Sequence, residues 1–310
     1  MIASVALGVR WTAADMPDQT GRTAVVTGAN SGLGYETCRA LAGHGARVIM
    51  AVRDADRGRA ARDRLRAEVP AGELVLGRLD LADLDSVRAF AASLVAAGAP
   101  VDVLVNNAGI GMPLRSLTAQ GFESQFGVNH LGHFALTGLL LPLLRRRAGA
   151  RVVTVSSAAY RGGSIRFDDL TGERSYRPVT FYRQSKLANV LFGLELDRRL
   201  RAAGVPVTSV LAHPGFATTN LPASGPDGLV GLVLRIANAL AQSAERGAWS
   251  QLYAATAAGV EGGQFFGPGG RTGTRGHPVL IRPSARATDP QTARRLWAVS
   301  TDLTGVRYEF

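Results

Sequence analysis

Apolar runs alternate with helix-patterned segments along most of the chain, the pattern of strands joined by crossover helices. The apolar runs are continuous, as in Val-Asp-Val-Leu-Val at residues 101–105, so both faces of each strand are expected to be covered. We predict an α/β fold, with a single domain built on a doubly wound parallel seven-stranded sheet. The predicted strands are residues 23–27, 47–52, 74–78, 101–106, 151–156, 207–212 and 263–266. The predicted helices begin near Gly32, Asp54, Asp83, Gln120, Thr180 and Ser243.

Two segments interrupt this rhythm. Residues 158–179 are polar and glycine-rich, and residues 216–242 contain a loop followed by an apolar helical stretch. Long excursions inside a compact domain are usually functional. We predict a substrate lid at residues 216–242, with plain packing on the sheet as the alternative. Residues 1–20 are expected to be an N-terminal leader, and residues 21–310 the domain.

A glycine-rich turn follows the first predicted strand. Residues 27–34 read Thr-Gly-Ala-Asn-Ser-Gly-Leu-Gly and lead into a helix. Glycines let the backbone approach a phosphate, and a helix N-terminus offers free N–H groups to it. The strand–turn–helix order favours a dinucleotide site over a turn that binds nothing. The candidate cofactor contacts here are Gly28, Asn30, Ser31, Gly32, Leu33 and Gly34.

The tip of the second strand indicates which dinucleotide binds. An NAD site places an acidic residue there to accept the ribose 2′-hydroxyl, whereas this chain has Val52 and Arg53. A guanidinium can pair with a 2′-phosphate. We therefore predict NADP(H), with Arg53 and Asn30 near that phosphate; the alternative is that Arg53 is a solvated helix-start residue. The next two strand tips provide further expected cofactor contacts, namely Asp80, Leu81, Asn107, Ala108 and Gly109.

The composition singles out one side chain: the chain contains 34 arginines and a single lysine, Lys186. Lys186 follows Tyr182 by four residues on a predicted helix, so the two share a face. An ammonium nearby, together with the positive nicotinamide ring of the cofactor, favours the phenolate and lowers the phenol's pKa. This would let Tyr182 exchange a proton with a substrate oxygen. Ser157 is expected to hold that oxygen, and Asn129 to position Lys186 through a water.

These motifs, taken in order, resemble those of the short-chain dehydrogenase/reductase family over residues 20–267. The resemblance implies a Rossmann fold and a catalytic tetrad of Asn129, Ser157, Tyr182 and Lys186, with Ser156 as the alternative serine. It also implies that Tyr182 and Lys186 contact the cofactor, together with Pro214, Gly215 and Thr218. The run at residues 182–192 and the insertion at 157–182 are similar to the branch of the family that contains retinol dehydrogenases and WW-domain oxidoreductases. The resemblance indicates a bacterial oxidoreductase of that branch.

The predicted function is an NADP(H)-dependent oxidoreductase that interconverts a carbonyl and an alcohol on a lipophilic small molecule, with Tyr182 as general acid/base. Two alternatives stay open. One is an NADP(H)-binding regulatory protein without turnover, which would not need Tyr182, Lys186 and Ser157. The other is a dehydratase or epimerase on the same scaffold, which typically retains NAD, and Arg53 speaks against it.

Charge and composition limit the partners. The formal net charge is +11, but the arginines are spread along the chain, which favours solvated helix faces over a nucleic-acid footprint. No apolar run reaches the ~18 residues of a membrane span, and no signal peptide is recognisable, so we expect a cytoplasmic protein. The resemblance implies a homo-oligomer through the long helices and leaves a monomer open.

Metal and disulfide chemistry are not expected. Cys38 is the single cysteine, which excludes an internal disulfide. His130 and His133 are three residues apart on a predicted helix, a spacing that can hold a metal. No cysteine or carboxylate completes a ligand set beside them, so structural roles are favoured.

Overall fold

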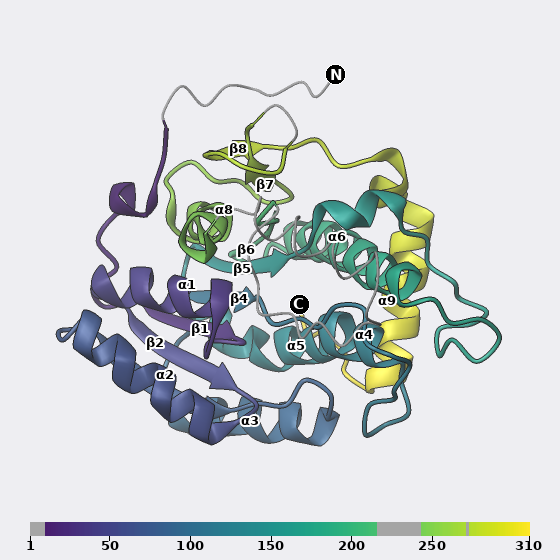
Figure 1. Cartoon of the computed structure of the whole chain (residues 1–310), viewed down its shortest axis with the longest axis horizontal. Coiled ribbons are helices and arrows are strands. Elements are labelled where there is room, and N and C mark those ends of the chain that lie inside the picture. Colours follow the sequence, from purple (N-terminus) through teal and green to yellow (C-terminus); the bar gives the residue numbers. More distant parts are fainter. Residues whose placement is uncertain (1–9, 216–242, 271–272) are drawn as a thin grey trace, which may run out of the picture.

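The computed structural model describes residues 10–215, 243–270 and 273–310. Its centre is an eight-stranded sheet in the order β3-β2-β1-β4-β5-β6-β7-β8 (Figure 1). Strands β1 to β7 pair in parallel, and β8 pairs antiparallel with β7. The strands are β1 Thr23–Thr27, β2 Arg47–Val52, β3 Glu73–Arg78, β4 Val103–Asn106, β5 Ala150–Val155, β6 Val207–Ala212, β7 Phe265–Pro268 and β8 Pro278–Leu280.

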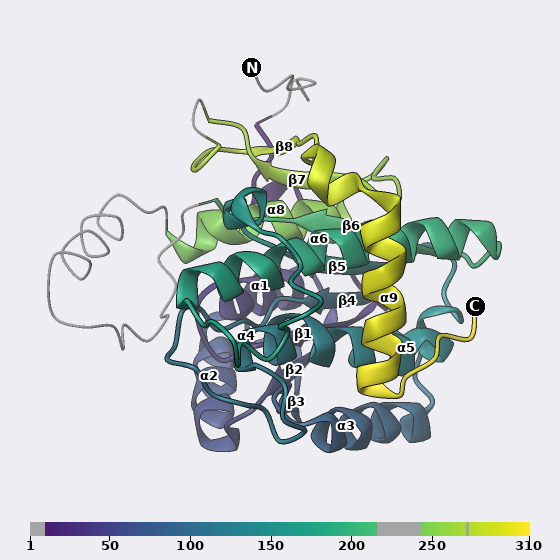
Figure 2. The ribbon, with the colours of Figure 1, turned by 90° about the vertical axis from the view of Figure 1, so that its right-hand side faces the viewer.

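Helices cover both faces of this sheet (Figures 1 and 2). One face packs against α1, α2 and α8, and the other against α3, α5 and α6, with α9 lying outside α6. The helices are α1 Gly32–Gly43, α2 Ala55–Glu68, α3 Leu84–Ala97, α4 Ser124–Phe126, α5 Gly132–Leu144, α6 Pro178–Ala202, α8 Ala244–Thr256 and α9 Pro290–Thr304. Short helical turns are η1 Ala13–Asp15, η2 Gly127–Leu131, η3 Ala158–Gly162 and η4 Ala285–Thr288.

Side-chain caps explain where several helices begin. Asp54 accepts hydrogen bonds from the backbone N–H groups of residues 56 and 57, Asp83 from that of residue 85, and Ser243 from that of residue 246. Such caps satisfy N–H groups that have no partner within the helix. The start predicted near Gln120 was wrong. The Gln120 side chain instead accepts a hydrogen bond from Leu84 N at 3.0 Å, and α4 begins at Ser124.

The prediction of seven strands was short by one. β8 is a three-residue edge strand that begins with a proline, and proline together with this short length counts against a strand prediction. The doubly wound order itself is confirmed, because the strand order reverses between β1 and β4. Ligands of such sheets bind beyond the carboxyl ends of the strands, at that reversal.

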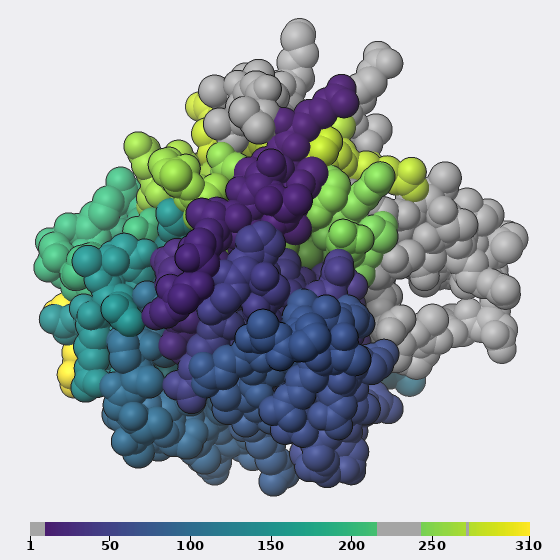
Figure 3. Space-filling model, turned by 90° about the vertical axis from the view of Figure 1, so that its left-hand side faces the viewer, coloured from purple at the N-terminus to yellow at the C-terminus, as the bar shows by residue number. Residues whose placement is uncertain are grey.

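The described part of the expected leader, residues 10–20, packs on the domain and lies along its surface (Figure 3). The Trp11 ring is buried edge-on against Tyr253, with 5.3 Å between ring centres, and the Trp11 carbonyl lies 3.0 Å from His277 Nδ1. The expected lid at residues 216–242 and the candidate contact Thr218 lie outside the described residues.

One helical run is long and apolar enough to cross a membrane. It comprises Ser124–Leu144, and 83% of its most apolar window is buried inside the protein. The run packs between the sheet, α3 and α6, so a core position accounts for its composition.

Candidate active site

A pocket of about 720 Å³ lies beyond the carboxyl ends of β1, β2, β4 and β5. It brings together nearly all residues predicted for the site. Asn129 lies just behind the wall, buried at 0% exposure. The predicted residues that line the pocket are Gly28, Asn30, Ser31, Gly32, Leu33, Gly34, Arg53, Asp80, Leu81, Asn107, Ala108, Gly109, Ser157, Tyr182, Lys186, Pro214 and Gly215.

The turn after β1 leaves its backbone bare toward the pocket. Gly28 has φ +67°, and a Cβ there would lie 3.0 Å from Ala108 Cα, so a side chain has neither the conformation nor the room. Gly32 has φ +54° and open space around it at the first turn of α1. A Cβ at Gly34 would overlap the Gly28 carbonyl. This cradle fits a pyrophosphate held by backbone N–H groups at a helix N-terminus.

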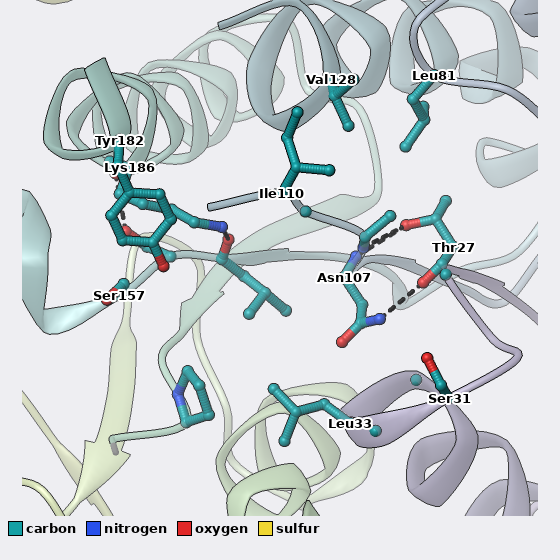
Figure 4. Close-up of a pocket in the computed structure, with 18 of the residues that line it drawn as sticks. Thr27, Ser31, Leu33, Leu81, Asn107, Ile110, Val128, Ser157, Tyr182 and Lys186 are labelled. Atoms are coloured by element: carbon teal, nitrogen blue, oxygen red, sulfur yellow. Dashed lines mark hydrogen bonds between the residues drawn. The ribbon is translucent and has the colours of Figure 1, made fainter. Parts of the chain in front are cut away.

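Thr27 ties the tip of β4 to the tip of β1. Its Oγ1 accepts from Asn107 N and Ala108 N, each at 2.9 Å, and Asn107 Nδ2 donates to Thr27 O at 2.7 Å (Figure 4). All three residues line the pocket. The loops that follow β1 and β4, which would both face a bound dinucleotide, are therefore fixed relative to each other.

The tip of β2 holds an arginine and a carboxylate with different roles. Arg53 is exposed and lines the pocket. Asp54 turns to α2, where hydrogen bonds from the backbone of residues 57 and 56 lower the pKa of its carboxyl group. Asp80, at the tip of β3, also lines the pocket while its Oδ1 accepts from Ala82 N at 2.9 Å.

Tyr182 and Lys186 enter the pocket from α6, opposite Ser157 (Figure 4). Lys186 Nζ lies 5.9 Å from the centre of the Tyr182 ring and donates to Val155 O at 3.4 Å. Burial lowers the pKa of Lys186 to about 8. Burial also raises the pKa of Tyr182, and a hydrogen bond from Ser157 opposes that rise. The lowering expected from Lys186 together with the nicotinamide ring therefore stays a prediction, since in the protein alone desolvation of the phenolate is the largest effect on this pKa.

The two candidate serines face different ways. Ser156 is buried, and its Oγ donates to the main-chain carbonyl of Lys186 at 2.8 Å. Ser157 caps η3 by accepting from Ala159 N at 3.2 Å and faces Tyr182 across the pocket. Both serines line the pocket, but it is the Ser157 hydroxyl that hydrogen-bonds to Tyr182.

Asn129 braces the site from behind. It lies in η2, a π-helical turn that widens the helix between α4 and α5, and such turns often occur at functional sites. Asn129 Oδ1 accepts from Ile110 N at 2.8 Å, and its Nδ2 donates to Ile110 O and Ser185 Oγ, each at 2.9 Å. A Cβ at Gly109 would lie 3.2 Å from Asn129 Oδ1 and 3.3 Å from Lys186 Nζ. Asn129 therefore joins the β4 loop to α6.

Several lining residues were missed by the sequence reasoning. Val179 precedes Tyr182 by three residues on α6, and Arg183 precedes Lys186 by three, so helical spacing was a signal that could have found both. Met112 carries a positive φ of 55°, which nothing in the sequence indicates. The apolar members of this missed group are Ala51, Leu79, Ile110, Met112, Val128, Val155, Ala158, Ala159 and Val179.

The histidines near the site hold hydrogen bonds. His133 contacts Thr27 Oγ1 and Asn129 O, His130 contacts Ser300 Oγ, and His213 Nδ1 accepts from Gly215 N at 3.1 Å. Across the described ranges, no three His, Cys, Asp or Glu side chains gather as a metal-binding group. The phosphate cradle and the Ser–Tyr–Lys group in one pocket instead define a class, the nucleotide-dependent dehydrogenases and reductases.

Comparisons with known proteins give the family. The model described as short chain dehydrogenase matches residues 22–227, and the chain belongs to the short-chain dehydrogenase/reductase family. Human retinol dehydrogenase 12 is 43% identical over 291 residues, covering 93% of this chain and 88% of that protein. Mouse polyprenol dehydrogenase is 44% identical over 299 residues, covering 94% of this chain and 86% of that protein. These relatives place the chain in the retinol dehydrogenase branch, as the motifs predicted.

Solved structures agree. The crystal structure of an uncharacterized protein from Mycobacterium paratuberculosis superposes with a TM-score of 0.81 at 45% identity, covering 97% of this chain and 100% of that chain. The RhlG/NADP complex from Pseudomonas aeruginosa has a TM-score of 0.63 at 26% identity, covering 80% of this chain and 94% of that chain. The predicted Rossmann fold is confirmed.

Proposed function

We propose that this protein is an NADP(H)-dependent oxidoreductase that interconverts a lipophilic carbonyl compound and its alcohol. The observation that carries the proposal is the convergence of Ser157, Tyr182 and Lys186 in the pocket that also contains the phosphate cradle. A regulatory protein that only bound the dinucleotide would have no use for a phenol, a hydroxyl and a buried ammonium in one place.

NADPH, when bound, supplies the hydride. Ser157 Oγ orients the substrate oxygen, and Tyr182 Oη donates a proton to that oxygen during reduction or accepts one during oxidation. Lys186 provides positive charge that favours the phenolate, and it can hold the cofactor ribose. Because burial keeps the pKa of Tyr182 above its ordinary value, the phenol is protonated at neutral pH and ready to donate.

The preference for NADP(H) rests on Arg53. Its guanidinium lies at the tip of β2 on the pocket edge, where a carboxylate would repel a 2′-phosphate. Asn30 lines the same end of the pocket. RhlG, a relative of similar architecture, was solved with NADP.

The lipophilic substrate class rests on the wall beside Tyr182. Ile110, Met112 and Val179 line that side, together with the small side chains of Ala158 and Ala159. Apolar walls favour apolar ligands, since burial removes hydrocarbon surface from water. Two relatives are named for retinol and polyprenol, which are apolar isoprenoid alcohols.

The test is NADPH consumption with a panel of aldehydes and ketones, pairing long apolar compounds such as retinal with short polar ones. We expect turnover with the apolar carbonyls and its loss in Tyr182→Phe. Tight NADPH binding without turnover of any carbonyl would favour the regulatory alternative.

Cytoplasmic localisation and a substrate lid at residues 216–242 remain proposals. Cell fractionation would test the localisation, and variants within residues 216–242 would test the lid.

A further inference from the structure

His133 bridges two parts of the site that lie on different elements. It sits in α5, one helical turn after Asn129, and is 1% exposed. Its Nε2 lies 2.9 Å from Thr27 Oγ1 at the end of β1. Its Nδ1 lies 3.0 Å from the main-chain carbonyl of Asn129. One imidazole thus contacts both the residue that ties the two cofactor loops and the residue that braces the catalytic helix.

Counting lone pairs and protons fixes the direction of these hydrogen bonds. Thr27 Oγ1 has two lone pairs, and Asn107 N–H and Ala108 N–H already donate to them. A third donor has no lone pair to use, so Nε2 of His133 accepts at this contact. It lies 2.9 Å from Thr27 Oγ1, closer than the other acceptor of the hydroxyl proton, Val105 O at 3.3 Å. The imidazole proton is then on Nδ1, where it donates to Asn129 O. This tautomer satisfies both ring nitrogens.

The surroundings keep this imidazole neutral. Burial lowers the pKa of His133 to about 4, and the charge of Lys186 acts in the same direction. A protonated ring would carry a second N–H aimed at Thr27 Oγ1, whose lone pairs are taken. At neutral pH, Nδ1 of His133 therefore stays the donor and Nε2 stays the acceptor.

We propose that His133 is a positioning residue that couples the dinucleotide cradle to the catalytic helix. At its Nε2 end, it orients the Thr27 hydroxyl so that both oxygen lone pairs point at the β4 loop. At its Nδ1 end, it pins the backbone of Asn129 within the π-turn, so that the Asn129 amide clasps Ile110 and Ser185. The proposal rests on the proposed function, because the coupling matters only if cofactor and substrate react in this pocket.

His130 supplies a matched control within the same helical run. It is also 1% exposed, and burial lowers its pKa to about 3. Its Nε2 lies 2.8 Å from Ser300 Oγ on α9, and it does not line the pocket. Loss of this imidazole should affect packing and stability while leaving the cofactor and proton-transfer groups in place.

Two substitutions separate the two ends of the bridge. In His133→Asn the side-chain amide lies at the level of Nδ1, so it keeps the donor to Asn129 and loses Thr27. In His133→Gln the amide reaches the level of Nε2, so it keeps the acceptor for Thr27 and loses Asn129. Each substitution loses one hydrogen bond, which corresponds to a change of about five- to tenfold in the NADPH Kd or in kcat.

The experiment measures kcat, KM for NADPH, the Kd for NADPH by fluorescence, and Tm in His133→Asn, His133→Gln and His130→Gln. We expect His133→Asn to weaken NADPH binding about five- to tenfold with little change in kcat. We expect His133→Gln to lower kcat about five- to tenfold with Kd nearly unchanged. His130→Gln should lower Tm without changing either constant.

The proposal is overturned if the two His133 variants change kcat and Kd in the same proportion, or if they lower only Tm, as His130→Gln does. If the wild type shows no turnover, the proposed function fails, yet the NADPH affinities still test the bridge. In that case, His133→Asn must bind NADPH more weakly than His133→Gln, and equal affinities would overturn the coupling.

Discussion

Ser156 and Lys186 are joined by a buried hydrogen bond, in which Ser156 Oγ donates to the main-chain carbonyl of Lys186 over 2.8 Å. The bond fixes the catalytic helix α6 against the tip of β5. Its neighbour Ser157 instead faces Tyr182 across the pocket. The two adjacent serines thus have the same hydroxyl group but different hydrogen-bond partners.

We expect Ser157→Ala to lower kcat about 100-fold or more, since it removes the hydroxyl that orients the substrate oxygen. Its Tm should change little. Ser156→Ala should instead lower Tm by a few degrees, the effect of about 1 kcal/mol for a lost buried hydrogen bond, and keep most of kcat. Steady-state kinetics and thermal melts of both variants check this; the reverse pattern would make Ser156 the catalytic serine.

Lys186 is expected to lower the stability of the fold. Its folded pKa of about 8 lies below the ordinary 10.5, so the unfolded chain binds the proton more tightly. The penalty is fully present below pH ~8 and disappears as pH rises through the ordinary pKa. We expect Lys186→Met to be inactive and more stable than wild type by about 1–3 kcal/mol at pH ~7, with a smaller difference near pH ~10. Denaturant unfolding at both pH values measures it; a less stable variant at neutral pH would contradict the burial argument.

Lys186→Arg tests why the single lysine stands here. The buried site holds a compact ammonium between Val155 O and the Tyr182 ring, and a planar guanidinium is larger and stays charged. We expect kcat to fall about 100-fold, with the NADPH Kd rising as well. Near-normal turnover with arginine would show that any cation suffices.

Arg53 should determine the cofactor preference. Arg53→Ala is expected to raise KM for NADPH about tenfold and to leave KM for NADH unchanged, because only NADPH carries the 2′-phosphate. Arg57→Ala is the matched control: Arg57 is exposed in the first turn of α2, four residues after Arg53, but does not line the pocket. A wild-type preference for NADH would remove the case for NADP(H).

The C-terminal helix α9 covers the helices through which the family resemblance implied oligomers. Trp297 is buried against Phe134 and Phe192, and Tyr308 Oη donates to Phe134 O at 2.7 Å. The open face that such an interface needs is occupied by the chain itself. We expect light scattering to give a monomer, and Trp297→Ala to cost about 3 kcal/mol of stability. A wild-type dimer would contradict this.

The parallel strands and the cofactor turn could be predicted because their signals are local. Continuous apolar runs mark strands covered on both faces, and Gly28 and Gly34 stand where backbone must approach backbone. Asp54 and Asp83 marked helix starts because a capping carboxylate acts within three residues. The grouping of Tyr182 with Lys186 followed from the single lysine in the composition and from helical spacing.

The remaining features depend on tertiary contacts. The π-turn at Asn129 and the positive φ of Met112 have no sequence signature, since packing around them sets the backbone. The net direction of the pKa of Tyr182 follows from burial, which spacing cannot report. Helix α9 is the exception: Asp289, Pro290 and Gly305 mark its ends, and it was overlooked.

The most direct test of the proposed reaction is to follow the hydride from NADPH to the product. NADPH carrying deuterium at the transferable position of its nicotinamide is incubated with an apolar aldehyde, and the alcohol product is weighed by mass spectrometry. We predict one deuterium on the former carbonyl carbon with the wild type and none with Tyr182→Phe, although that variant still binds NADPH. Alcohol formed without deuterium, or in equal yield by the variant, would contradict hydride transfer in this pocket with Tyr182 as the proton donor.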